Sequence, residues 1–125
     1  MLKTPDVKKI IIDRLKSAFP DTPVVSKRPD KNPPPEEFIR VIAAGGPGRT
    51  SRVLSRVSLI IDTYAASTGT AAALAARVHE QLLLLPSSEV PVSVVEAGEP
   101  AEVPDPDRTD RSRYSAAYTF TIRLI

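Results

Sequence analysis

The sequence contains no cysteine and no tryptophan, and only one histidine, among its 125 residues. The lack of cysteine excludes disulfide bonds, a thiolate nucleophile and cysteine-ligated metals within the chain, so packing has to hold the fold together. The single histidine, His79, excludes a catalytic or metal site built on several histidines. It lies between Val78 and Glu80 in a predicted helix, and we expect it to border the core.

Long apolar runs are also missing, because none approaches the roughly 20 residues that cross a bilayer. The first 16 residues interleave charged with apolar side chains, so we expect neither a secretory signal nor a membrane partner. Net charge is only +2, and the six aromatic residues lie outside the basic clusters. A dedicated nucleic-acid-binding protein usually concentrates its basic residues with aromatics between them. Arginine outnumbers lysine, which favours a protein partner.

Hydrophobic periodicity predicts two helices. Thr4 is the expected N-cap of the first, with Pro5 and Asp6 in its first turn, and this helix should end near Phe19 before Pro20. The second should begin after the stretch 67–70 (STGT), run from Ala71 to about Leu85 and end at Pro86. The stretch 67–70 could also hold an anion, but helix capping needs the same residue types.

Alternation and turn residues predict four to five strands. We expect strands near residues 24–27, 37–44, 52–64 and 90–95, and a final strand whose even-numbered residues from Tyr114 to Leu124 face the core. The proline-rich segment 28–36 should be a stiff spacer of polyproline II type. Residues 96–113 look too polar and proline-rich to pack, which predicts an exposed, mobile loop. The order of elements predicts one α+β domain over residues 1–125, with a mostly antiparallel sheet and both helices on one face.

Residues 42–54 (IAAGGPGRTSRVL) resemble a phosphate-binding loop at first sight. A P-loop needs four residues between its glycines, a lysine and a following helix. Here two residues separate Gly45 from Gly48, Arg49 replaces the lysine, and an alternating strand follows. The glycines therefore predict the turn of a β-hairpin, with Arg49 at its tip.

Other candidate sites are weak. Asp105, Asp107 and Asp110 are spaced like part of a calcium loop but lack its central glycine and distal glutamate, so we expect a solvated loop. No nucleophile, base and orienting group occur together, so we predict a protein that is not an enzyme and has no metal or cofactor. The remaining candidates are arginines that either solvate the open sheet face or contact another subunit or partner. These are Arg49, Arg52, Arg56, Arg111, Arg113 and Arg123.

Taken in order, the chain resembles the tail terminator proteins of long-tailed, lambda-like bacteriophages. The matching parts are the opening helix TPDVKKIIIDRLKSAFP, the strand SRVSLIIDTYA, the helix TAAALAARVHEQLL and the closing strand RYSAAYTFTIRLI behind an acidic, proline-rich loop. The resemblance covers nearly the whole chain but contains no sharp motif.

The resemblance implies a virion protein, made in the host cytoplasm, that acts at the junction of head and tail. Identical subunits would close into a ring, taken as a hexamer, that caps the tube of major tail protein and stops its growth. The ring would also give the surface on which the head completion or connector protein docks, and its lumen could pass DNA without recognising a specific sequence. A head-tail connector or tail completion protein, and a small module that binds nucleic acid or peptide, are the alternatives.

Overall fold

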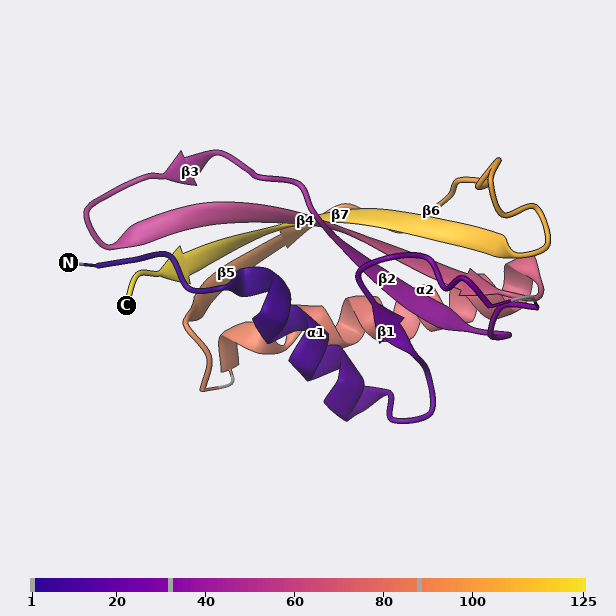
Figure 1. Cartoon of the computed structure of the whole chain (residues 1–125). Coiled ribbons are helices and arrows are strands. Elements are labelled where there is room, and N and C mark those ends of the chain that lie inside the picture. The colour runs from indigo at the N-terminus through magenta and orange to yellow at the C-terminus, as the bar shows by residue number, and fades with distance from the viewer. Residues whose placement is uncertain (1, 32, 88) are drawn as a thin grey trace.

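The computed structural model describes residues 2–31, 33–87 and 89–125, and it contains two helices and one seven-stranded, mostly antiparallel sheet. The predicted α+β architecture, with both helices on one face of the sheet, is confirmed (Figure 1). The strands are β1 (Val24–Val25), β2 (Phe38–Ala43), β3 (Gly48–Arg49), β4 (Leu54–Ala65), β5 (Val92–Ala97), β6 (Ala101–Glu102) and β7 (Ser112–Arg123). The main order is β1-β2-β4-β7-β5, with β3 beside β4 and β6 beside β7.

Two long strands, β4 and β7, form the middle of the sheet. They pair antiparallel in one unbroken register from Leu54 opposite Arg123 to Ala65 opposite Ser112. Alternate side chains point to opposite faces of a strand, and the helix face of this pair is mostly apolar, with Ser55 and Thr63 as buried polar residues on β4. The predicted alternation of β7 is confirmed, because Ala116, Tyr118, Phe120, Ile122 and Leu124 are all buried.

The two helices cover the lower face of the sheet in Figure 1. They are α1 (Val7–Ala18) and α2 (Thr68–Leu83), and a short 3-10 turn (Leu85–Ser87) follows α2. Ser67 caps α2 by accepting a hydrogen bond from the Thr70 N–H, so capping by the stretch 67–70 is confirmed. The helix begins three residues before the predicted Ala71, because the cap is the first residue of that stretch, and it ends at Leu83 instead of about Leu85. Within the described residues, neither helix has the length and apolar character needed to cross a membrane.

The predicted start of the first helix is wrong by two residues. Asp6, not Thr4, is the N-cap, and its carboxylate accepts the Lys9 N–H. The residues before it are held extended, because Lys3 exchanges two backbone hydrogen bonds with Ile125. Pro5 therefore belongs to an extended segment beside the C-terminal strand instead of to the first helical turn.

Gly69, in the first turn of α2, does not have a positive φ, and a Cβ added there would meet nothing within 4 Å. Gly69→Ala should therefore raise the free energy of unfolding by about 0.5 kcal/mol, because alanine loses less backbone entropy in a helix. The opposite change at the exposed Ala73 of the same helix, Ala73→Gly, should lower it by about 1 kcal/mol. Thermal or urea unfolding measures both, and an unchanged or lower midpoint for Gly69→Ala contradicts this account of the helix.

The hairpin predicted around the glycines is confirmed, but its tip lies elsewhere. Gly45 and Gly46 run beside β4, where the Ala44 N–H and Gly45 carbonyl bond to Ser58, and β3 then continues the pairing. The chain turns at residues 50–53, where the Ser51 hydroxyl accepts the Val53 and Leu54 N–H groups. Arg52, not Arg49, therefore lies at the tip.

Candidate interaction surface

The face of the sheet opposite the helices is open over its hairpin half (Figure 1). On this face Arg56 of β4 pairs with Glu96 of β5 at 2.7 Å, across the intervening strand β7. The hydroxyls of Ser58 and Thr119 bond to each other at 2.9 Å. The surface is therefore largely polar, although Val94 of β5 is exposed on the same face. Its ion pair is exposed enough that it contributes at most about 0.5 kcal/mol to folding.

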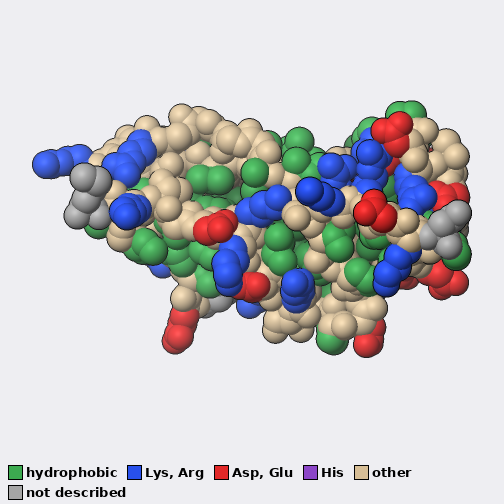
Figure 2. Space-filling model, in the orientation of Figure 1, with side chains coloured by type: hydrophobic (Ala, Val, Ile, Leu, Met, Phe, Trp, Pro, Cys, Tyr) green, Lys and Arg blue, Asp and Glu red, His purple; other side chains and the backbone are tan. Residues whose placement is uncertain are grey.

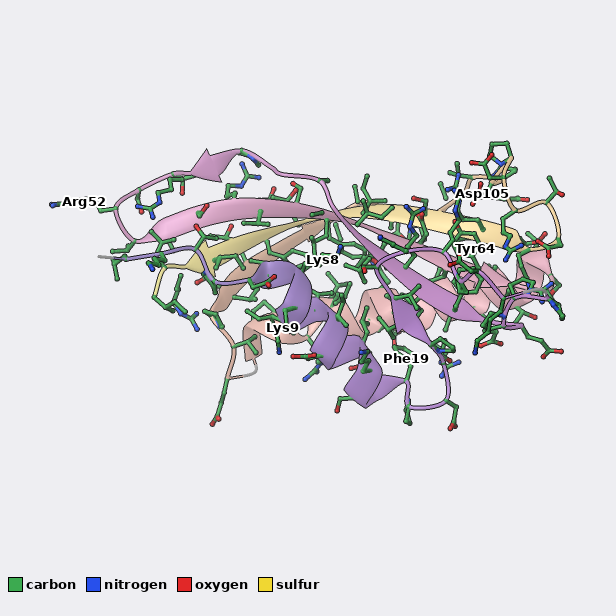
Figure 3. The ribbon with its side chains drawn as sticks, viewed as in Figure 1. Lys8, Lys9, Phe19, Arg52, Tyr64 and Asp105 are labelled. Atoms are coloured by element: carbon green, nitrogen blue, oxygen red, sulfur yellow. The ribbon has the colours of Figure 1, made fainter. Side chains whose placement is uncertain are left out.

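The other half of the same face is covered by the loop 103–111, between β6 and β7. Most side chains of this loop are exposed, as predicted, but the Asp105 side chain is buried against the sheet. Phe38 and Tyr64 stack here with ring centroids 4.3 Å apart, and both side chains are fully buried. The covering residues include Asp105, which is only 4% exposed although we predicted it in a solvated loop. Figure 3 shows Tyr64 of β4 lying beneath Asp105 of this loop.

Asp105 holds the loop to the sheet through several charged or polar groups. Its carboxylate accepts the Tyr64 hydroxyl at 2.7 Å and the Arg28 guanidinium at 3.1 Å, and its own loop supplies the Asp107 N–H at 3.0 Å. Arg113 lies 4.0 Å from the same carboxylate and 3.6 Å from the buried Asp62. The burial of Asp105 is therefore accompanied by partners for its charge.

Arginines join this loop to the proline-rich segment 28–36. Arg111 donates to the carbonyls of Pro34 and Pro35, and Arg108 donates to those of Pro29 and Lys31. Prolines have no N–H, and an extended proline-rich chain leaves its carbonyls without regular partners, so a guanidinium with five donors suits them. Segment 28–36, of which Asn32 lies outside the described residues, is thus a packing partner of the loop and not the predicted spacer.

The charges in this cluster shift two pKa values in opposite directions. Burial would raise the pKa of Asp105, but hydrogen bonds from Tyr64, the Asp107 N–H and Arg28 outweigh it and hold that pKa below its ordinary value. Burial and the bond to Asp105 raise the pKa of Tyr64. Asp105 is therefore ionised and Tyr64 protonated at neutral pH.

Acidification should remove part of the contribution that Asp105 makes to the free energy of unfolding. Because its folded-state pKa is depressed, this contribution is complete above the ordinary carboxyl pKa of about 3.9 and is lost as the pH falls through the lower, folded-state value. Urea unfolding should show that the natural chain has a higher free energy of unfolding than Asp105→Asn, by an amount that is constant between about pH 5 and about pH 7. This difference should shrink below about pH 4. A difference in free energy of unfolding that stays constant down to about pH 2 would contradict the depressed pKa of Asp105.

The hairpin end of the molecule brings three chain segments together. The Leu124 N–H donates to the Val53 carbonyl, and Arg49 donates to the Leu2 carbonyl. Among the described residues, Arg52 has no hydrogen-bond or ion-pair partner, and Figure 3 shows it projecting beyond the ribbon. Val53 beside it is 54% exposed. The strand expected near residues 52–64, in which the alternation from Val53 to Ile61 predicts that Val53 faces the core, begins only at Leu54, so that prediction is wrong for Val53.

The structure separates the six arginines proposed from the sequence. Arg49 and Arg52 lie at the hairpin end, and Arg56 lies on the open sheet face. Arg111 and Arg113 bond to backbone carbonyls in the loop cluster, the contacts between segments 28–36 and 103–113 around Asp105. Arg123 bonds to the Val90 carbonyl and to Ser93 of β5. As a group they do not form one patch.

The remaining candidates are accounted for by packing. His79 bonds through Nδ1 to the Tyr118 hydroxyl at 2.9 Å and so borders the core, as predicted. Burial and nearby Glu99 raise the pKa of Tyr118 to about 12, so its hydroxyl stays protonated. Among the described residues, no three or more acidic, histidine or cysteine side chains gather as a metal site.

One sequence signal could have located the covered half of the sheet. Tyr64 has the same strand parity as Arg56, Ser58 and Asp62, so alternation places a large aromatic ring on the face expected to be polar. Phe38 is its cross-strand neighbour on β2. Two adjacent aromatics on a polar face indicate that another segment covers them.

Comparison of the sequence with models of protein families and with curated proteins finds no match.

Proposed function

We propose that this chain is a phage tail terminator, a virion protein that closes into a ring on the end of the tail tube and stops its growth. The observation that carries the proposal is the open, polar sheet face that continues into a projecting hairpin (Figure 1). The resemblance to tail terminators rests on four segments of the sequence in a fixed order, and these segments form α1, β4, α2 and β7. Such a ring works through shape and heterologous contacts between copies, and it requires no catalytic group.

In this proposal the ring, a hexamer by the resemblance, contacts the major tail protein on one side and the head completion protein on the other. The arginines of the loop cluster are already bound to backbone carbonyls. These guanidiniums are held in contacts within the subunit instead of lining an open surface for a phosphate backbone, which favours protein partners over a nucleic-acid-binding module.

Capping of tail tubes by the arginine variants tests the proposal. Arg52 has no partner among the described residues and Arg56 forms one exposed ion pair. Changing both to serine should therefore cost less than about 1 kcal/mol of stability. The same double variant should leave tubes overlong when the major tail protein of the same virion polymerises with it.

The matched control removes two lysines from the opposite side of the molecule, Lys8→Ala and Lys16→Ala on α1. It makes the same change in net charge and should leave tube lengths as they are with the natural chain. Normal tube lengths with the arginine variant would contradict the proposed contact. Salt-sensitive retention of the natural chain on DNA, without any effect on tubes, would instead favour the nucleic-acid-binding alternative.

A further inference from the structure

A hollow of about 300 Å³ lies where α2 faces the connection 98–100 between β5 and β6. Small side chains on one side of α2 leave this space, because two alanines stand four residues apart there. The lining includes Ala72, Ala76 and Glu80 of α2, Glu99 and Pro100 of the connection, and Tyr114 of β7. The hollow therefore combines apolar walls, an aromatic ring and carboxylates.

The charge of this hollow is negative. Its lining contains two glutamates and, among the described residues, no lysine or arginine. Neither Glu80 nor Glu99 forms a hydrogen bond or an ion pair with another described residue. Burial raises the pKa of Tyr118 to about 12 and the Glu99 charge adds to this rise, so the Glu99 carboxylate lies toward the hydrogen-bonded pair of His79 and Tyr118.

Basic side chains lie elsewhere on the surface. On the face that Figure 2 shows, lysine and arginine side chains are mixed with those of aspartate and glutamate. Arg77 of α2 lies over the Phe19 ring, 5.0 Å from its centre. Arg113 of β7 donates to the carbonyls of Val103 and Pro104. These two arginines therefore leave the charge of the hollow unbalanced.

An arginine side chain matches all three parts of the lining. Its planar guanidinium donates paired hydrogen bonds to a carboxylate and stacks on an aromatic ring, which the ammonium of lysine cannot do in the same way. Its methylene groups pack on small apolar side chains such as Ala72, Ala76 and Pro100. A volume of about 300 Å³ is at the lower limit for small-ligand sites, so it suits one side chain instead of a larger cofactor.

We infer that this hollow binds an arginine side chain that projects from a partner protein, with the guanidinium close to Glu80, Glu99 and the Tyr114 ring. The inference does not depend on the proposed ring. The site lies beside α2, which covers the opposite face of the sheet from Arg56 (Figure 1), so it adds a second surface to the one proposed for the tail tube.

The single histidine allows a direct test, because His79 also lines the hollow and gives one set of imidazole signals in an NMR spectrum. N-acetyl-arginine amide, added at constant ionic strength, should shift these signals until they saturate, with a dissociation constant of about 1–10 mM. N-acetyl-citrulline amide has nearly the same shape without the charge, and it should leave the signals unchanged.

Variants then test the two carboxylates. Glu80→Gln with Glu99→Gln should weaken binding of the arginine amide by at least about tenfold. The matched control, Asp21→Asn with Glu89→Gln, removes the same charge outside the lining and should leave the affinity within about twofold of the natural chain. All four residues are exposed, so we expect each variant to fold.

Three results would overturn the inference: no saturating shift with the arginine amide up to about 50 mM, an equal shift with the citrulline analogue, or equal weakening in the control variant. Putrescine that binds at least about tenfold more tightly than the arginine amide would identify a free polyamine as the ligand, and so would overturn the assignment to a partner protein. Capping of tail tubes is measured separately, so each proposal can fail without the other.

Discussion

Asp105→Ala should lower the free energy of unfolding by about 3 kcal/mol, the largest effect expected of any single charged residue here. The change leaves the buried Tyr64 hydroxyl without its acceptor and removes the carboxylate that Arg28 and Arg113 share. An unpaired buried hydroxyl alone costs about 1–3 kcal/mol. Arg28 keeps about a third of its side chain exposed and can return to water, which limits the total.

Thermal unfolding measures this loss, which corresponds to a midpoint lower by about 10 °C in a domain of this size. Hydrogen exchange should also show faster exchange of the amides in 103–112. Asp107→Ala is the matched control, because its side chain is 73% exposed and only assists in binding Arg28; it should change stability by less than about 0.5 kcal/mol. Equal effects at the two positions would contradict the assignment of Asp105 as the residue that holds the loop.

Gly46→Ala should be comparably damaging for a different reason. Gly46 has a φ of +112°, and a Cβ there would lie 2.7 Å from the Ser58 nitrogen and 2.9 Å from the Arg56 carbonyl oxygen. Both contacts are with backbone of the central strand, which cannot move away without breaking the sheet. The backbone strain and the overlap each cost about 1–3 kcal/mol, so we expect a loss of about 3 kcal/mol in total.

Two neighbouring glycines provide the control for this prediction. Gly45 and Gly48 also have positive φ, but a Cβ at either would meet nothing within 4 Å. Alanine there should cost only about 1 kcal/mol, from backbone strain alone. Urea unfolding of the three variants separates overlap from strain, and three equal losses would mean that the close approach of Gly46 to β4 is wrong.

The part of the fold that follows from local patterns could be predicted from the sequence. Apolar and polar residues alternate along β7 because one face of the strand is buried and the other is not. The alternation alone therefore places Tyr118 and Phe120 on the core face. The stretch 67–70 indicates the start of α2 to within three residues, because the Ser67 side chain accepts a hydrogen bond from an N–H three residues away. Both signals lie within a few residues of the structure that they specify.

The loop cluster could not be predicted in the same way, because its partners are distant in the sequence. Asp105 bonds to residues 41 and 77 positions away, and Arg111 bonds to carbonyls 76 and 77 positions away. Composition therefore indicated a solvated loop, whereas long-range pairing buries the Asp105 side chain within it. The tip of the hairpin was misplaced for a related reason, since glycines that form a bulge beside a strand have the same local appearance as glycines that form a turn.

The most direct test of the proposed function is to see where the protein binds on a tail tube. Ser17→Cys gives a single thiol on the exposed side of α1 for a gold label, and labelled protein can be added while tubes of the major tail protein of the same virion grow. Electron microscopy should show label at one end of each tube, and no further growth from that end. Label along the tube walls, or tubes that grow as long as without the protein, would contradict the proposal.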